Sequence, residues 1–256
     1  MVDGHDRRAF LLGAAGAALL PMVARATAQD LDVPYVPTPP EVVAGMLDLA
    51  ELKAGERLVD LGSGDGRIPI AAARRGATAL GVEIDHRLVT RARSLAQIAD
   101  QSARARFLRA DLFTVSLRDA DVVTLYLLPD VNEKLKPKLL NELRPGARVV
   151  SHAFDMGDWP PDVARSIAER QVYLWTIPAT AGGDWRLTRA DGTVSRLTIE
   201  QRYSAITGTL DDRPFRDARL HGVEIGFTID GTRYDGVLEY HLIRSNSAVQ
   251  WHADRL

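Results

Sequence analysis

Short apolar runs alternate with helical patterns along the first two thirds of the chain. The runs predict strands at Leu58–Leu61, Ala79–Glu83, Ala105–Arg109, Asp121–Pro129 and Ala147–Phe154. Between them, spacings typical of amphipathic helices predict helices at Ile68–Arg75, Arg87–Ala99 and Val131–Leu143. Regular alternation of buried strands with helices indicates an α/β fold, a doubly wound parallel sheet with helices on both faces.

The pattern changes after Gln171. Val172–Pro178 predicts a further strand that completes the sheet, and we expect Asp184–Leu187 to pair with it. From Val194 onward, short alternating runs with turn signals such as Asp230-Gly231 predict an antiparallel extension of five or six strands. Phe227 and Trp251 are its expected core residues, and His221, His241 and His252 are expected to face solvent or cap turns. The predicted domains are 29–190 and 191–256.

Residues 1–28 have the three-part layout of a secretory signal. Arg7-Arg8 precede a small, apolar run at Phe10–Leu20, and Ala26-Thr27-Ala28 follows as a small-x-small cleavage site. The arginine pair favours the twin-arginine route, which predicts export to the periplasm or cell envelope. The alternative is an uncleaved N-terminal anchor that retains the protein at the membrane, although Phe10–Val23 is shorter than the roughly 20 residues of a membrane span.

The next segment, Asp32–Pro40, is proline-rich and therefore rigid and extended. Thr38 is the predicted N-cap of a helix that runs to about Leu52, with Pro39 at its first position and Glu41 completing a capping box. Such a segment either folds over a ligand as a lid, with Tyr35 and Thr38 facing it, or is a plain N-terminal arm.

A glycine loop follows the first predicted strand. Gly62, Gly64 and Gly66 alternate directly after Leu61, and the next predicted helix begins at once. Glycine lets the chain turn sharply and lets a ligand approach the backbone, and a helix N-terminus offers free N–H groups. The dinucleotide pattern Gly-x-Gly-x-x-Gly/Ala requires a small third residue, which is Arg67 here, so the loop departs from that pattern.

Three acids accompany the loop. Asp60 precedes it, and Glu83 stands at the end of the second strand, where a carboxylate can accept hydrogen bonds from a ribose diol. Asp111 follows the third strand, where it either accepts a hydrogen bond from an exocyclic adenine amine or caps the helix that comes next. Together the loop and the acids predict a nucleoside-containing ligand.

The amino-acid composition excludes several kinds of functional site. The chain has 256 residues, 46% of them hydrophobic, with 32 basic and 34 acidic side chains, so no overall positive field indicates nucleic acid. It contains no cysteine, which excludes disulfides and thiolate sites, and its six histidines do not occur at metal-ligand spacings. We therefore expect no metal site and no nucleic-acid partner.

Several motifs occur in an order that resembles a known family. They are Pro34–Pro37, Leu58–Ile68, Gly81–Ile84 with Leu88-Val89 and Ala92-Arg93, Ser116–Asp119, Glu142-Leu143, Gly146–Ser151, and Trp159 with Pro161. Over about Val33–Trp175 they resemble the seven-strand, Rossmann-like S-adenosylmethionine-dependent methyltransferases. The closest resemblance is to the small lysine methyltransferase family whose mitochondrial members modify the ATP synthase c subunit and the adenine nucleotide carrier. This chain departs from that family at Asp85-His86, where the family tends to have Asn-Pro, and in its long C-terminal extension.

The resemblance implies S-adenosyl-L-methionine as cofactor and a protein lysine, near a membrane, as methyl acceptor. The expected cofactor-binding residues are Tyr35, Thr38, Asp60, Gly62, Ser63, Gly64, Asp65, Gly66, Glu83, Ile84, Asp111, Leu112 and Tyr126. Tyr126 is also the candidate catalytic residue, and Asp65 and Asp155 are further candidates at the pocket edge. The alternatives are a small-molecule acceptor on the same core, or a non-catalytic protein of the cell envelope that binds the cofactor. The oligomeric state stays open.

Overall fold

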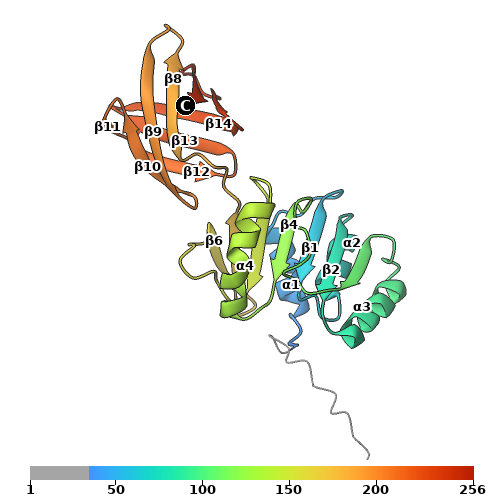
Figure 1. The fold of residues 1–256 in the computed structure, drawn as a ribbon. Coiled ribbons are helices and arrows are strands. Elements are labelled where there is room, and N and C mark those ends of the chain that lie inside the picture. The colour runs from blue at the N-terminus through green and yellow to red at the C-terminus, as the bar shows by residue number, and fades with distance from the viewer. Residues whose placement is uncertain (1–34) are drawn as a thin grey trace, which may run out of the picture. The chain divides into compact units, whose positions relative to one another are not determined.

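The computed structural model describes residues 35–256, in which the strands form two sheets (Figure 1). The helices are α1 (Pro40–Leu49), α2 (Arg67–Arg74), α3 (His86–Ile98) and α4 (Pro129–Glu142). The first sheet contains β1 (Arg57–Leu61), β2 (Thr78–Glu83), β3 (Ala105–Arg109), β4 (Val122–Leu125), β5 (Arg148–His152), β6 (Val163–Ile167) and β7 (Arg170–Thr176). Each element predicted from the alternating pattern before residue 155 is present. The predicted signal at 1–28 lies outside the described residues.

The first sheet has the strand order β3-β2-β1-β4-β5-β7-β6. Strands β1 to β5 pair in parallel, whereas β7 runs antiparallel to β5 and β6 antiparallel to β7. The doubly wound α/β prediction is therefore confirmed, as is the predicted strand at Val172–Pro178. The edge strand β6 was not predicted, because its mostly half-exposed and exposed residues form no apolar run.

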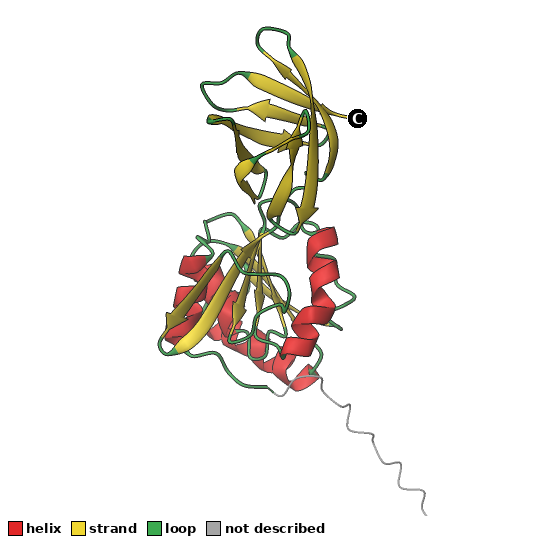
Figure 2. Ribbon diagram, turned by 90° about the vertical axis from the view of Figure 1, so that its left-hand side faces the viewer, coloured by secondary structure: helices red, strands yellow, loops and turns green. Residues whose placement is uncertain are grey.

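Helices cover both faces of this sheet, as Figure 2 shows. On one face, Val42 and Met46 of α1 pack with Leu58 of β1 and with the neighbouring strands. On the other face, Leu135 and Leu139 of α4 form the core with strand residues that point the opposite way. A strand covered on both faces is mostly apolar, and every residue of β4 is accordingly buried, including Thr124, the single polar residue of this strand.

The second sheet is antiparallel and has the order β11-β10-β9-β8-β16-β15-β14-β13-β12. Its strands are β8 (Gly183–Arg189), β9 (Val194–Arg202), β10 (Ala205–Leu210), β11 (Arg213–Pro214), β12 (Arg216–His221), β13 (Glu224–Ile229), β14 (Thr232–Glu239), β15 (Leu242–Ser245) and β16 (Trp251–Arg255). Phe227 and Trp251 are buried in its core, as predicted. His221, His241 and His252 are exposed, which is also as predicted.

Two expectations for this region were wrong. The strand at Asp184–Leu187 does not pair with the first sheet, because β8 pairs with β9 and β16. The antiparallel region also contains more than five or six strands, since eight follow Val194. Trp185 and Leu187 are buried while Arg186 is exposed, so the alternating pattern correctly indicates a strand with one buried face. That pattern carries no information about which strands are its neighbours. The change of sheet falls between Thr176 and Gly183, and the predicted domain limit at 190 stays a prediction.

None of the helices that the structure describes is long and apolar enough to cross a lipid bilayer.

Candidate functional site

The functional residues predicted from the sequence lie at the carboxyl edge of the parallel strands. In an open α/β sheet, ligands bind in the crevice where the strand order reverses, which is here between β1 and β4. The glycine loop leaves β1, and Glu83 ends β2. On the other side of the crevice, Tyr126 directly follows β4 and His152 ends β5. We call these sides the donor half (β1–β3) and the acceptor half (β4 and β5), after the methyl donor and the methyl acceptor that the sequence predicts.

The register places several of these side chains on one face. Side chains two residues apart on a strand point the same way, and Leu58 of β1 and Val150 of β5 both pack towards α1. Asp60 and His152, each two residues further along its strand, are therefore on that face too. Asp60 pairs with Thr124, and Leu125 pairs with Ser151, so Tyr126 comes level with His152.

The glycine loop is held in a path that other residues would strain. The backbone N–H groups of Gly62 and Ser63 both donate to the carbonyl of Val82 at 2.9 Å. Gly64 has φ +52° and Gly66 has φ +82°, conformations that suit glycine. A Cβ at Gly64 would clash with the ring of Tyr35. The loop is therefore packed tightly against its surroundings, and α2 begins immediately after it.

Glu83 is oriented entirely by backbone groups. Its Oε2 accepts a hydrogen bond from the Gly64 N–H at 2.9 Å, and its Oε1 accepts from Ile84 at 2.8 Å and from Asp85 at 2.9 Å. The carboxylate ties the glycine loop to the end of β2 and still has lone pairs for other donors. Its predicted bond to a ribose diol stays a prediction.

Asp60 is buried beneath the loop and 3% exposed. Thr124 donates to its Oδ1 at 2.7 Å. Burial raises the pKa of Asp60 to about 7, and the carboxylates of Glu83 and Asp65 act in the same direction, while the bond from Thr124 opposes them. Three acids thus converge on the donor half, which suits a positively charged ligand.

The N-terminal arm is joined to the glycine loop through Arg67. This guanidinium donates to Asp65 from Nε at 2.9 Å and from Nη2 at 2.7 Å, and its Nη1 donates to the Thr38 carbonyl at 2.7 Å. Burial raises the pKa of Asp65, but the hydrogen bonds of Arg67 and Tyr35 outweigh it, so the pKa lies below its usual value. Tyr35 and Thr38 therefore lie beside the loop, an arrangement consistent with the predicted lid.

The predicted role of Thr38 as helix cap was wrong. Helix α1 begins at Pro40 with Pro39 as its N-cap residue, and no side chain caps it. The Thr38 hydroxyl instead lies 3.2 Å from Nδ1 of His152, 114 residues away. A buried hydroxyl needs a hydrogen-bond partner, and the imidazole satisfies it.

His152 was not singled out by sequence reasoning. Its side chain is 1% exposed, and its ring centroid lies 3.9 Å from that of Tyr126, with the two planes tilted by 32°. Burial, together with the positive charge of Arg170, lowers the pKa of His152 to about 4, so the imidazole is neutral. His152 could have been predicted as a site residue from its position near the carboxyl end of the predicted strand Ala147–Phe154, where ligands of parallel sheets bind.

The segment that follows β5 is held by hydrogen bonds from a side chain of α4. Asn132 of α4 donates to the carbonyls of Phe154 and Asp155 at 3.3 and 3.1 Å, and Ser151 Oγ donates to the Phe154 carbonyl at 2.6 Å. Asp155 is exposed, and its carboxylate accepts from the Gly157 N–H at 3.1 Å. These bonds hold the segment after His152 in place.

The remaining predicted cofactor residues flank the donor half. Ile84 follows β2 and is 37% exposed, and Leu112 is half-buried against the core on the α4 side. Asp111 is exposed and accepts a hydrogen bond from the Phe113 N–H at 2.8 Å. It thus caps a turn and not a helix, so the predicted helix cap was wrong, because the chain continues from β3 to β4 without one. Its predicted adenine contact stays a prediction.

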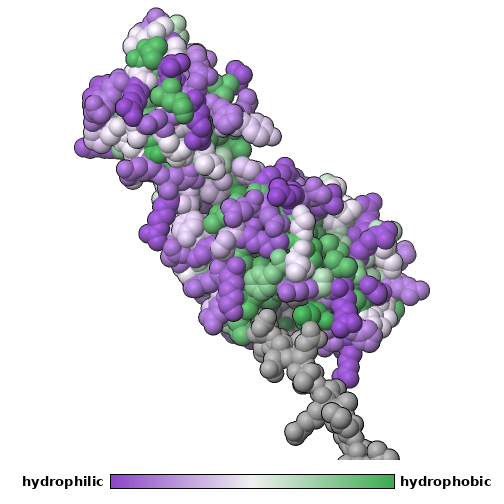
Figure 3. All heavy atoms as spheres, viewed as in Figure 1, coloured by the Kyte–Doolittle hydropathy of each residue, from purple (hydrophilic) through white to green (hydrophobic). Residues whose placement is uncertain are grey.

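The rim of the carboxyl edge is apolar. Tyr35, Val36, Ile84 and Leu128 are 39%, 54%, 37% and 37% exposed. Tyr35 packs on Gly64 and is followed by Val36, while Ile84 comes directly after β2 and Leu128 directly before α4. On the face shown in Figure 3, hydrophobic residues likewise gather over the middle of the first sheet. Exposed large hydrophobic side chains gathered at one edge indicate a binding surface.

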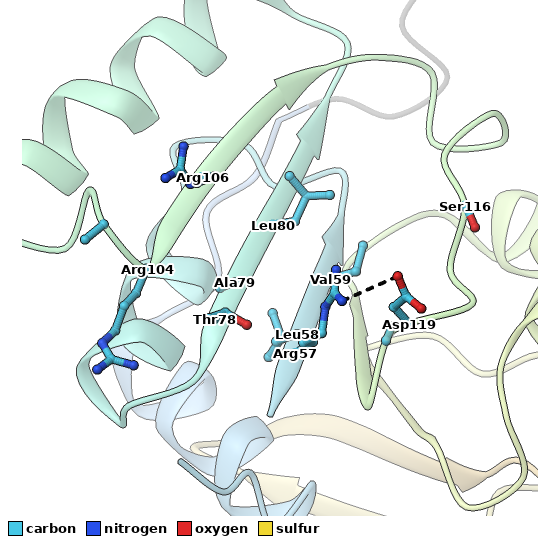
Figure 4. Close-up of a pocket in the computed structure, with 12 residues that line it drawn as sticks. Arg57, Leu58, Val59, Thr78, Ala79, Leu80, Arg104, Arg106, Ser116 and Asp119 are labelled. Carbon is cyan, nitrogen blue, oxygen red and sulfur yellow. Dashed lines mark ion pairs between the residues drawn. The ribbon is translucent and has the colours of Figure 1, made fainter. Parts of the chain in front are cut away.

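A pocket of about 320 Å³ lies elsewhere on the first sheet (Figure 4). It is lined by the first residues of β1 and β2, by Arg104 and Arg106, and by Asp119, which pairs with Arg57 at 3.4 Å. These positions are at the amino ends of the strands, opposite the edge where the glycine loop lies. The pocket is therefore not part of the candidate site.

Comparisons with known proteins place the first sheet among methyltransferases. Residues 60–163 match the family model described as ANTKMT methyltransferase domain. A protein-lysine N-methyltransferase from Saccharolobus islandicus is 42% identical over 151 residues, which are 57% of this chain and 94% of that protein. The mouse adenine nucleotide translocase lysine N-methyltransferase is 43% identical over 148 residues, 57% of this chain and 64% of that protein.

A solved structure gives the same match in three dimensions. The crystal structure titled RNA methyltransferase from Salinibacter ruber, in complex with S-adenosyl-L-homocysteine, is 52% identical to this chain. The match covers 56% of this chain and 94% of that one, with a TM-score of 0.55.

Proposed function

Because this chain belongs to the ANTKMT methyltransferase family, we propose that it transfers a methyl group to the side-chain amine of a protein lysine. It is an S-adenosylmethionine-dependent enzyme, and the cofactor, when bound, supplies the methyl group on a positively charged sulfur. The observation that supports the proposal best is the contrast across the crevice. Acids gather on the donor half, whereas Tyr126 and a neutral His152 line the acceptor half.

The residues of the donor half suit this cofactor. Asp65, whose pKa lies below its usual value, provides negative charge for a sulfonium or an ammonium group, and Asp60 and Glu83 add hydrogen-bond acceptors beside it. The backbone N–H groups of the glycine loop are bonded to Val82, Ser63 and Glu83, so the loop holds these acids and the start of α2 in place. Methyl transfer needs the attacking nitrogen, the methyl carbon and the sulfur in line, so orientation accounts for most of the catalysis.

The protein acceptor is favoured by the names of two relatives, each called a lysine N-methyltransferase. The rim made by Tyr35, Val36, Ile84 and Leu128 is apolar, so it suits contact with a protein better than contact with the phosphate backbone of a nucleic acid. RNA is the second candidate, because a structure 52% identical to this chain is titled RNA methyltransferase. A small-molecule acceptor on the same core is the alternative to both.

One labelling experiment separates these acceptors. The purified chain is incubated with tritiated S-adenosylmethionine and, in parallel, with a cell-envelope extract, total RNA or a small-molecule fraction. We expect label in a protein band whose acid hydrolysate contains methyllysine. Label in RNA or in the small-molecule fraction alone would contradict the lysine proposal, and cofactor binding without transfer to any fraction would indicate a binding protein.

A matched pair of variants makes this result specific. Asp60→Ala removes the buried acid of the donor half, so we expect it to abolish labelling. Glu239→Ala removes an exposed acid of the second sheet that pairs with Arg244 at 3.2 Å, and we expect it to label as the unchanged protein does.

We also propose that the chain is exported through the twin-arginine route and acts on an acceptor close to the membrane. The basis is the sequence of residues 1–28, which lie outside the described residues. Protease treatment of spheroplasts tests the export, because an exported protein is digested. Full protection would contradict export, and recovery with the membrane fraction would support the uncleaved anchor.

A further inference from the structure

His152 combines deep burial with an unused polar atom. Its Nδ1 lies 3.2 Å from the Thr38 hydroxyl, but no group in residues 35–256 bonds its Nε2. A buried polar atom without a partner costs about 1–3 kcal/mol of stability. Such a cost at the edge of a crevice indicates an atom whose partner is a ligand.

The surroundings place this atom on the acceptor half. Tyr126 follows β4 and lies over the His152 ring, and His152 itself ends β5. Asn132 fixes the segment after His152 by donating to the carbonyls of Phe154 and Asp155. The imidazole is thus held from both sides at the edge where the glycine loop begins.

We propose that His152 Nε2 binds the methyl acceptor, accepting a hydrogen bond from the amine that receives the methyl group. The inference rests on the proposed function and names the group that orients its substrate. When the Nδ1–H donates to Thr38 Oγ1, the lone pair of the ring is on Nε2, which is then a hydrogen-bond acceptor with no partner in the described residues.

The proposal adds no proton transfer to His152. During transfer the amine lone pair forms the new N–C bond, the electrons of the broken C–S bond go to sulfur, and the amine proton leaves to water. A neutral imidazole suits this role, since an imidazolium would repel the sulfonium and would have no lone pair to accept the amine N–H. Burial disfavours the protonated ring, and the positive charge of Arg170 acts in the same direction, so the His152 imidazole carries no charge.

The arm gives this contact a link to the donor half. Thr38 carries the hydroxyl that meets His152, and its carbonyl accepts from Arg67, which pairs with Asp65 in the glycine loop. The residue that sets the orientation of the imidazole is therefore tied to the loop of the donor half. This link predicts that Thr38→Val disturbs transfer through His152.

The test separates orientation of the acceptor from folding and from cofactor binding. We expect His152→Leu to lower the rate of labelling of the cell-envelope extract about tenfold, while the affinity for S-adenosylhomocysteine changes less than twofold in calorimetry. His152→Gln keeps an acceptor atom and should recover at least a third of the rate. Thr38→Val should fall between these two, and His252→Gln, an exposed position of the second sheet, should match the unchanged protein.

A spectroscopic measurement applies even if no protein is labelled. The probe is n-butylamine, a model of the lysine side chain, added at pH 9 to the ¹⁵N-histidine-labelled protein with S-adenosylhomocysteine. We expect the Nε2 resonance that is missing in His152→Leu to shift, and the His252 resonance to stay. An unmoved His152 resonance, or a His152→Leu variant that binds S-adenosylhomocysteine and labels at the full rate, would overturn the inference. Absence of label with the unchanged protein would instead count against the proposed function.

Discussion

The two halves of the carboxyl edge differ in the charge of their side chains. On the donor half, Asp60, Asp65 and Glu83 bring carboxyl groups close together, and each is held by hydrogen bonds. On the acceptor half, Tyr126 and His152 contribute stacked rings, and the imidazole is neutral. The donor half is therefore suited to a cation and the acceptor half to an uncharged amine.

The contrast also shows how the two halves are built. The donor half consists of segments close in the chain, and the glycine loop donates backbone N–H groups to the Val82 carbonyl and to the Glu83 carboxylate at the end of β2. The acceptor half joins residues far apart in the chain, such as Thr38 and His152. Changes in the donor half should therefore affect cofactor binding, and changes in the acceptor half should affect transfer alone.

The largest expected effect comes from the buried acid of the donor half. Asp60 has a pKa of about 7 in the folded chain against 3.8 in the unfolded chain, so between these values the folded chain holds a proton that the unfolded chain lacks. The free energy of unfolding should fall as the pH rises from 4 to 7, by an amount on the order of 4 kcal/mol. Asp60→Asn, measured by urea unfolding over this range, should lack that component. Equal pH dependence in both proteins would contradict the shifted pKa.

The second prediction concerns Glu83. Glu83→Ala leaves three backbone N–H groups without their acceptor, so the loop loses its tie to β2. The affinity for S-adenosylhomocysteine should drop about 100-fold, or roughly 3 kcal/mol, in calorimetry. Glu83→Gln, which keeps one acceptor oxygen, should lose less. Unchanged binding by the alanine variant would show that the acid does not hold the donor half.

The third prediction tests the tight packing of the loop. A Cβ at Gly66 would lie 2.5 Å from the Phe107 ring and 2.9 Å from the Ala92 Cβ, whereas one at Gly55 would meet nothing within 4 Å. Both glycines have a left-handed φ, +82° and +86°. Gly66→Ala should therefore destabilise the fold by roughly 2 kcal/mol more than Gly55→Ala does. Equal losses in denaturant unfolding would mean that the loop has room to relax.

The smallest expected effect is on the acceptor half. In the described part of the chain, no hydrogen bond to the Tyr126 hydroxyl is formed, and the ring contributes by its contact with His152. Tyr126→Phe keeps that contact and should change the rate of transfer less than threefold, about 0.6 kcal/mol. Tyr126→Ala removes it and should lower the rate further at unchanged cofactor affinity. A large loss in the phenylalanine variant would make the hydroxyl a catalytic group.

Much of the core architecture could be predicted from the sequence because its signals are local. Strand β3 has the bounds predicted for it, Ala105–Arg109, and α2 is displaced by a single residue from Ile68–Arg75. Apolar periodicity reports which face of an element is buried, and the glycines report where the backbone must turn. The donor half could be predicted for the same reason, since its acids directly adjoin these elements.

The tertiary structure decided the side-chain contacts and strand pairings that join residues far apart in the chain. Thr38 has the sequence context of a helix cap, yet its hydroxyl meets His152 because the fold brings the arm to the end of β5. Trp185 and Leu187 predict a strand, but only the fold shows that β8 joins β9 and β16. The sequence by itself thus determined the helices and parallel strands of the first sheet and the acids of the donor half, since local backbone preferences and periodic burial act within a few residues. The acceptor half and the second sheet's pairing were decided by long-range contacts, which no local pattern records.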